Sequence, residues 1–300
     1  MSQTALHTPE SLRLRSETVA AGLPALLVDA QHLANTVMLG EHGRRRAGVG
    51  AEFWQYRPTE MGDSYRSIDW RRSARADATF VRQTEWQAAQ ALMLGVDEAA
   101  SMTFTGSAKG RKARPSKLRR AQTLALGLAI LAIRGGERVG LTHLAEPPRS
   151  GSAQLMRLAS ALMDHDTRED YGAPKPRILP EGGRAVLFSD FLGPLAPVES
   201  FLTQAADREV KGSVVQVLDP DEEVFPFDGR TVFESMSGAV RFETLKAKSL
   251  RDAYLDRLAE RKEALQTLAR RTGWRYHCHH TDRPPEATLL WLYTSLEKVR

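Results

Sequence analysis

Three strand-like apolar segments of this chain each end in an aspartate, which can bind a cation or cap a helix. They are residues 91–96 before Asp97, 185–188 before Ser189 and Asp190, and 213–218 before Asp219. In parallel α/β sheets, ligands bind outside the carboxyl ends of the strands, where the strand order reverses. Oxygen ligands of this kind are what a hard divalent cation such as magnesium requires. We therefore expect Asp97 and Asp190 to share one cleft. In the structural alternative, they cap the helices that follow their strands.

A second group of residues that could do chemistry lies between Arg57 and Arg75, where acidic side chains alternate with five arginines. The wider range from Arg44 to Arg82 contains nine arginines and five acidic residues, so its net charge is +4. A basic segment of this kind can attract a phosphate backbone or an acidic protein surface. The same arginines could instead form ion pairs within the chain, because the two signs of charge alternate closely.

This arginine-rich segment admits two interpretations. In the functional one, a recognition surface for an acidic or nucleotide-bearing partner is formed by Arg57, Asp63, Arg66, Asp69, Trp70 and Arg75. In the structural one, Asp63 holds a tight turn, Asp69 pairs with Arg66 or Arg75, and Trp70 packs the segment onto the sheet. We favour the structural interpretation, because alternating charges indicate an internally satisfied network. An interface could still be built on that network.

These motifs resemble a bacterial family, the domain-of-unknown-function 58 family. Residues 57–75 match its signature R-x-Y-x-x-G-D-x-x-R-x-I-D-W-x-x-S/T-A-R at nearly every position. Thr59 departs from it, at a position where the family usually carries an aromatic residue. Residues 218–243 are similar to the family's D-P-x-E…F-x-F-x-G…F-x-x-x-x-x-G run. The resemblance implies that the carboxy-terminal part is similar to a von Willebrand factor A domain.

The resemblance also implies a ligand set. A magnesium-binding von Willebrand A domain carries D-x-S-x-S after its first strand, then a threonine and an aspartate from later loops. Asp97 corresponds to the first aspartate of this motif, Ser101 to its second serine, and Asp190 to the aspartate from a later loop. Ala99 stands at the position of the first serine. The threonine has three candidates, Ser150, Ser152 and Thr167. Losing a hydroxyl ligand weakens magnesium binding, so we expect a degenerate site with no cofactor or, at most, weakly bound magnesium.

Members of this family resemble partners of MoxR-type AAA+ ATPases, and von Willebrand A domains generally bind proteins. The resemblance therefore implies a non-enzymatic interaction module with a protein partner, a MoxR-type AAA+ ATPase. One alternative is a magnesium-dependent phosphodiester or phosphate enzyme that uses Asp97, Asp190 and Asp219, with arginines on the phosphate. Another, which we weigh lower, is nucleic-acid binding through residues 44–46 and 71–72.

Composition limits the class of protein. The chain has 300 residues, 42% of them apolar, and a net charge of +5; this is enough to bury a large core. Its single cysteine, Cys278, excludes an internal disulfide and fits a reducing compartment. No secretory leader is recognisable, and the longest charge-free apolar segment, residues 121–133, is shorter than the roughly 20 residues of a membrane span. We expect a cytoplasmic protein.

The run from His277 to His280 contains three histidines and Cys278. Side chains alternate between the two faces of an extended segment, so His277 and His279 would face away from Cys278 and His280. Four zinc ligands cannot converge in that way. We therefore interpret the run as a partly exposed strand end.

The elements that must position these residues form a strand–helix alternation. We expect strands at 91–96, 138–144, 185–188, 213–218 and 274–278, and helices at 117–134, 153–163, 198–209, 246–271 and 287–296. Strands separated by helices predict a mostly parallel sheet with helices on both faces. The fold class is thus α/β and von Willebrand factor A-like, with a β-hairpin insertion at 231–234 and 239–242. Residues 106–117 are expected to form a mobile basic loop.

The domain division follows from the same pattern. Residues 1–86, with a helix within 11–40 and short strands around the signature, form an expected amino-terminal satellite. Residues 87–300 form the expected von Willebrand factor A-like domain.

Overall fold

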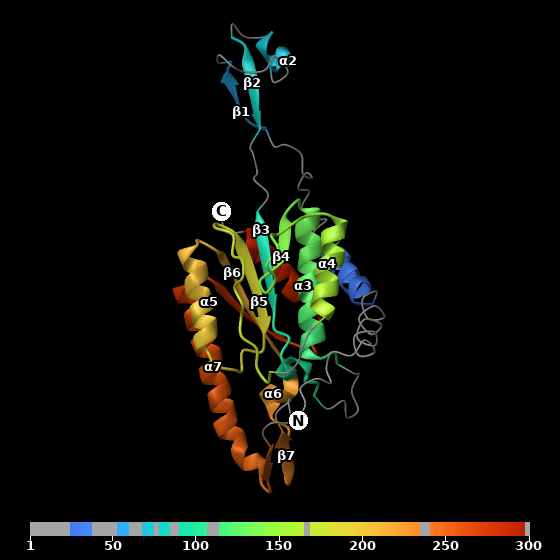
Figure 1. Cartoon of the computed structure of the whole chain (residues 1–300), viewed down its shortest axis with the longest axis vertical. Helices are drawn as coiled ribbons and strands as arrows, with labels where there is room; N and C mark the ends of the chain where they lie inside the picture. The colour runs from blue at the N-terminus through green and yellow to red at the C-terminus, as the bar shows by residue number, and fades with distance from the viewer. Residues whose placement is uncertain are drawn as a thin grey trace, which may run out of the picture. The chain divides into compact units, whose positions relative to one another are not determined.

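The computed structural model describes most of the chain, and the chain divides into two compact units. The described residues are 25–37, 53–59, 68–74, 78–84, 90–106, 114–164, 169–234 and 241–297; for 53–57, 81–84 and 297 only the backbone is described. The larger unit comprises residues 1–41 and 90–300, and the smaller comprises residues 42–89. Each unit is described by itself (Figure 1).

The larger unit is built on a five-stranded sheet in the order β4-β3-β5-β6-β9, in which every neighbouring pair is parallel. The strands are β3 (Ala91–Val96), β4 (Arg138–Leu141), β5 (Arg184–Ser189), β6 (Lys211–Leu218) and β9 (Arg275–His280). From β3 the chain crosses to β4 on one side and then returns to β5 on the other side. The strand order therefore reverses between β3 and β5, whose carboxyl ends are aligned because Val96 is the register partner of Phe188.

Helices cover both faces of this sheet. The connecting helices are α3 (Lys117–Arg134), α4 (Ser152–Met163), α5 (Ala196–Asp207), α7 (Arg251–Arg271) and α8 (Pro285–Glu297). Side chains alternate along a strand, so Leu92 and Leu94 join the core beneath α3, α4 and α8, whereas Met93 joins the core beneath α5 and α7 (Figure 1). The predicted α/β architecture, a parallel sheet with helices on both faces, is confirmed and is consistent with a von Willebrand factor A-like fold.

The amino-terminal helix at residues 25–37 belongs to this larger unit. Its buried side chains, among them Leu26 and Leu33, are part of the core that contains α3. Gly127 of α3 gives Leu33 room, because a Cβ at Gly127 would lie 3.3 Å from the Leu33 side chain. We expected a satellite over residues 1–86; the structure instead groups this helix with the sheet and leaves 42–89 as the smaller unit.

The smaller unit contains a two-stranded antiparallel ribbon and one short helix. The ribbon pairs β1 (Phe53–Pro58) with β2 (Phe80–Thr84), and the helix is α2 (Trp70–Ser73). The backbone N–H of Asp69 donates to the carbonyl of Phe80 at 2.9 Å, and the Phe80 N–H donates to Ser73 Oγ at 2.9 Å. These two bonds attach the start and the end of α2 to β2.

The hairpin insertion lies between β6 and α7 and is attached through an aromatic cluster. It follows the short helix α6 (Pro220–Val224) and consists of β7 (Thr231–Glu234) and β8 (Arg241–Thr244), with the short 3-10 helix η4 (Ala247–Leu250) leading into α7. Phe225 stacks on Phe233 of β7 at 5.8 Å and lies 5.0 Å from Tyr254 of α7, measured between ring centroids. Phe225 adopts φ 47°, a left-handed conformation that ends α6. The hairpin is therefore fixed beside the carboxyl ends of the strands (Figure 1).

Candidate functional site

Asp97 and Asp190 lie at the adjacent carboxyl ends of β3 and β5, where the strand order reverses. The Asp97 N–H donates to the carbonyl of Phe188 at 2.8 Å, and Ser189 Oγ donates to Asp97 Oδ2 at 2.6 Å. The residue that precedes Asp190 thus holds the carboxylate of Asp97. Ligand sites of parallel α/β sheets occupy this position, and we call it the carboxyl edge.

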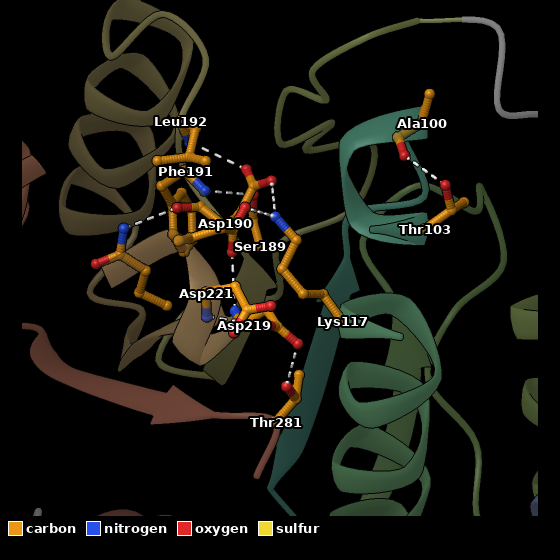
Figure 2. Close-up of polar contacts among 12 residues, drawn as sticks. Ala100, Thr103, Lys117, Ser189, Asp190, Phe191, Leu192, Asp219, Asp221 and Thr281 are labelled. Carbon is orange, nitrogen blue, oxygen red and sulfur yellow. Dashed lines mark hydrogen bonds and ion pairs between the residues drawn. The ribbon is translucent and has the colours of Figure 1, made fainter. Parts of the chain in front are cut away.

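Both aspartates also fix the backbone that follows their strands. Asp97 Oδ1 accepts a 2.9 Å hydrogen bond from the N–H of Ala99. Asp190 Oδ1 accepts a 3.0 Å hydrogen bond from the N–H of Leu192, which Figure 2 shows. Asp97 therefore turns the chain into the 3-10 helix η3 (Ala100–Thr103), which contains Ser101. Asp190 closes a turn, since α5 begins several residues later. In both cases the carboxylate accepts a hydrogen bond from the backbone just after its strand. This role resembles the structural alternative, in which the two aspartates cap the helices that follow their strands.

The cation at this edge is supplied by Lys117, the first residue of α3. Its side chain is 1% exposed, and its Nζ lies 2.8 Å from Asp190 Oδ2 and 2.6 Å from Glu222 Oε1 (Figure 2). The same Nζ lies 5.7 Å from the centre of the Phe104 ring. An ammonium buried to this extent is tolerated only when it is paired and hydrogen-bonded. Lys117 thereby links α3 to the end of β5 and to α6.

A second ionic group lies beside the first. Asp219, which ends β6, accepts a hydrogen bond from Thr281 Oγ1 at 2.9 Å and lies 3.1 Å from the guanidinium of Arg114. Arg114 also lies 3.1 Å from Asp221. Asp219 caps α6 through a capping box, in which Glu222 bonds back to the Asp219 N–H at 2.8 Å. The three aspartates of the enzymatic alternative are thus all held by protein groups.

The electrostatics of the edge follow from its burial. Burial raises the pKa of Asp97 although Ser189 stabilises its charged form, and burial also raises the pKa of Glu222 despite Lys117. Burial and then the charge of Asp97 raise the pKa of Glu98 to about 7. Burial alone would lower the pKa of Lys117, but its two carboxylate partners outweigh burial and raise it. Lys117 therefore stays charged at neutral pH.

The residues at the edge do not fit a magnesium ion. Magnesium demands near-octahedral oxygen coordination at about 2.0–2.1 Å. Ala99 has no oxygen to offer, and Asp190 Oδ2 faces the Lys117 ammonium instead of a metal. Gly172 lies so close to Asp97 that a Cβ at this position would overlap the carboxylate. Ser101 Oγ is the exception, since it is buried without a hydrogen-bond partner in the described part of the chain.

The two described candidates for the missing threonine, Ser150 and Ser152, do not lie at this edge. Arg149 pairs with Val139 near the start of β4, so the chain has returned toward the amino ends of the strands by that point. Ser150 and Ser152 come directly after it and are exposed. Thr167 lies outside the described residues.

Of the six residues proposed for the arginine-rich surface, two have described side chains. Asp69 Oδ1 caps α2 by accepting from the N–H of Arg72 at 3.0 Å, which is a structural role. Trp70 is 59% exposed. Arg57 pairs with Val81 through the strand register, with its side chain outside the description, and Asp63, Arg66 and Arg75 lie outside the described residues. Asp69 thus supports the structural interpretation, whereas the exposure of Trp70 leaves an aromatic surface available.

The histidine run shows the alternation expected of a strand. His277 and His279 both contact Thr288 Oγ1, at 3.1 and 2.8 Å. Cys278 and His280 face the other way, where His280 Nε2 lies 2.8 Å from Glu223 Oε2. The ligand atoms of Glu223, Cys278 and His280 lie within 4.8 Å of one another, although Lys262 also pairs with Glu223. The described contacts account for this group as an ion-paired cluster.

Sequence reasoning missed Lys117 and Glu222. Two signals could have revealed the lysine. It lies four residues before Ala121, on the apolar stripe of α3, and a cation at a helix amino terminus is unfavourable unless an acidic partner compensates. Glu222 carried a weaker signal, the Asp219-x-x-Glu222 spacing of a capping box.

The fold defines the class of this chain, a parallel α/β domain with helices on both faces of its sheet. The chain belongs to the family described as protein of unknown function DUF58, whose family model matches residues 55–264. The uncharacterized proteins Rv1480 of Mycobacterium tuberculosis and Mb1516 of Mycobacterium bovis are each 27% identical over 296 residues, covering 93% of this chain and 90% of the relative.

Two solved structures are similar to this chain at lower sequence identity. A conserved hypothetical protein, BatB from Bacteroides thetaiotaomicron, has a TM-score of 0.40 and 14% identity, covering 70% of this chain and 99% of its own. An uncharacterized membrane spanning protein from Vibrio fischeri has a TM-score of 0.21 and 16% identity, and the match covers 70% of this chain and 100% of that protein's chain. Among the helices described for this chain, none combines the length and apolar character that crossing a bilayer demands.

Proposed function

We propose that this chain is a non-enzymatic interaction module that docks a protein partner at its carboxyl edge. The observation that carries the proposal is the distribution of exposed apolar side chains. Of the nine large apolar side chains exposed in the described part of the chain, five lie on the segments around this edge. They are Tyr171, Val224, Val232, Phe242 and Leu245, with exposed fractions of 47, 55, 41, 53 and 72%. Exposed apolar surface bordered by polar groups is typical of protein-binding sites.

The ionic network beneath these side chains supports the same proposal. Lys117 is buried, Glu222 and Arg114 are largely buried, and each of the three is paired with an oppositely charged side chain, which favours one arrangement of this part of the edge before any partner binds. A preorganised surface loses less conformational freedom on association. Tyr171 packs against the segment that follows Asp190, because a Cβ at Gly193 would lie 2.7 Å from the Tyr171 Cβ.

We propose a MoxR-type AAA+ ATPase as the partner and the cytoplasm as the place of action. The support for the partner is the family resemblance, and the support for the compartment is the single cysteine. The arginine-rich segment is proposed as a further contact surface through Arg57, Asp63, Arg66, Asp69, Trp70 and Arg75. The exposed Trp70 is its best support, since tryptophan is enriched among the residues that dominate binding energy.

Binding of this chain to a purified MoxR-type ATPase from the same cell, measured by biolayer interferometry, tests the proposal. Val224→Glu and Phe242→Glu should each weaken binding at least about tenfold, since each places a charge in an apolar contact. Met156→Glu and Leu290→Glu are the controls, on side chains that are 47 and 41% exposed on α4 and α8. Equal losses from the control variants, or no binding by the wild-type chain, would refute the proposal.

A further inference from the structure

At the carboxyl edge, the ammonium group of Lys117 links three separate elements. Lys117 starts α3, Asp190 follows β5, and Glu222 lies on α6; the Lys117 Nζ reaches both carboxylates within 2.8 Å. A divalent ion held by loop carboxylates at this edge would link the same strand ends and loops. The ammonium is covalently part of the chain, so the link is present whatever ions the solution contains.

The oxygens that a metal would require are already used. Asp190 Oδ1 accepts from the Leu192 N–H and Oδ2 from Lys117. Asp97 Oδ1 accepts from the Ala99 N–H and Oδ2 from Ser189. Each carboxylate oxygen at the two strand ends therefore has a protein donor. A magnesium ion would have to displace these donors and also give up its own water shell, which it releases reluctantly.

Packing limits the space beside Asp97, whereas the Lys117 ammonium occupies the space beside Asp190. Gly172 lies against the Asp97 carboxylate, and the loop that contains it is fixed to η3, because the N–H groups of Ala100 and Ser101 donate to the carbonyls of Glu169 and Asp170 at 2.8 and 2.9 Å. Among the described residues, Ser101 Oγ is thus the one neutral oxygen of this group that has no hydrogen-bond partner. One hydroxyl does not make a magnesium site.

We propose that Lys117 permanently replaces the divalent cation of this edge, so that the edge is held together, and is ready for docking, without a metal. The missing serine at Ala99 is then a consequence of the replacement rather than the cause of lost metal binding. This inference concerns how the edge is built and holds whether or not the proposed partner is the right one.

Isothermal titration of MgCl2 and of MnCl2 into the full-length protein tests this. The wild-type protein should show no saturable binding. Ala99→Ser, which restores the absent hydroxyl, should show none either, because the ammonium still lies on Asp190. Only Ala99→Ser combined with Lys117→Met, which removes the ammonium and keeps the aliphatic stem, should gain saturable binding. A matched control, Ala99→Ser combined with Lys262→Met, removes a lysine from a partly exposed pair and should gain none.

Saturable metal binding by the wild-type protein or by Ala99→Ser alone would overturn the proposal. So would a folded Ala99→Ser/Lys117→Met variant that binds no metal. Because the loss of Lys117 leaves two carboxylates unpaired and could prevent folding, thermal melts of the wild-type protein provide an independent measurement. Its Tm should be the same in millimolar MgCl2 and in EDTA, and a lower Tm in EDTA would contradict the inference.

Discussion

Glu98 directly follows Asp97, and its surroundings keep its carboxyl group protonated at a pH where an ordinary glutamate is charged. Burial is the main cause, and the charge of Asp97 adds to it; together they raise the pKa of Glu98 to about 7. Its Oε1 atom is buried without a hydrogen-bond partner among the described residues. Ionisation is costly for a carboxyl group that is partly removed from water and has an oxygen without a hydrogen-bond donor. The folded state therefore retains a proton on Glu98 that the unfolded chain releases at lower pH.

We expect the contribution of Glu98 to the free energy of unfolding to decrease as the pH rises from about 4.5, its unfolded value, to about 7. At this group the folded state binds more protons than the unfolded state, so a rising pH favours unfolding. Asp97 and Glu222 add slopes of the same sign, because burial raises their pKa values too. Slopes of the opposite sign come from three histidines whose pKa values burial lowers, His277, His279 and His280. Glu98→Gln should remove the Glu98 share, roughly 2 kcal/mol once its partial exposure to solvent is considered.

Urea unfolding at a series of pH values measures this slope. Between about pH 4.5 and about pH 7, the slope of the unfolding free energy against pH should be more positive in Glu98→Gln than in the wild-type protein, and Glu98→Gln should be more stable at neutral pH. Glu146→Gln, at an exposed turn position, is the control and should keep the wild-type slope. An unchanged slope in Glu98→Gln would show that the proton is held elsewhere.

At the scale of elements, the loop that ends at Gly172 is fitted to the end of β3. The Asp97 carboxylate is held by Ala99 and Ser189, so it cannot move aside for a side chain at position 172. We expect Gly172→Ala to lower the free energy of unfolding by about 1–3 kcal/mol, the usual cost of overpacking. Chemical denaturation followed by circular dichroism gives the value.

The matched control for this prediction is Gly135→Ala at the end of α3. Gly135 has φ −74°, which any residue adopts, and its Cβ would lie no closer than 3.3 Å to a neighbouring atom. Its replacement should change stability by no more than about 0.5 kcal/mol. A loss for Gly172→Ala as small as the loss for Gly135→Ala would mean that the loop yields easily and does not close the edge.

The elements themselves were largely predictable, because local patterns specify them. The apolar runs predicted the bounds of β3, β5 and β6 to within two residues. The apolar stripe predicted α3 with its observed bounds. The hairpin was found within two residues, since β8 covers Arg241–Thr244 where 239–242 was expected. The strand expected at 138–144 ends at Leu141, because the following residues turn back along β4.

The ionic arrangement of the edge was less predictable, since it depends on long-range contacts. Lys117 was interpreted as the end of a mobile basic loop, yet it is buried against Asp190 and Glu222, which are 73 and 105 residues away in the sequence. No local pattern indicates which carboxylate a lysine will meet. The order of the strands determines it, and here that order brings the ends of β5 and β6 beside the start of α3.

At the scale of the whole molecule, both core clusters belong to the larger unit. Every buried residue of the cluster beneath α3, α4 and α8 lies within 26–37 or from Leu92 onward, and the cluster beneath α5 and α7 begins at Met93. Among the residues whose side chains are described, those of the ribbon and of α2 in the smaller unit contribute to neither cluster. A unit with a complete core can fold without its neighbour, so residues 42–89 are expected to serve recognition more than stability.

Replacing residues 42–89 with a flexible Gly/Ser linker tests this division. We expect the shortened protein to unfold cooperatively, with a Tm close to that of the full chain, because no residue of either core cluster is removed. Differential scanning calorimetry measures the Tm, and interferometry with the proposed ATPase measures binding. Retained stability with weaker binding would assign the arginine-rich segment a recognition role. A large loss of cooperativity would show instead that the smaller unit stabilises the larger one, as the structural interpretation of Trp70 requires.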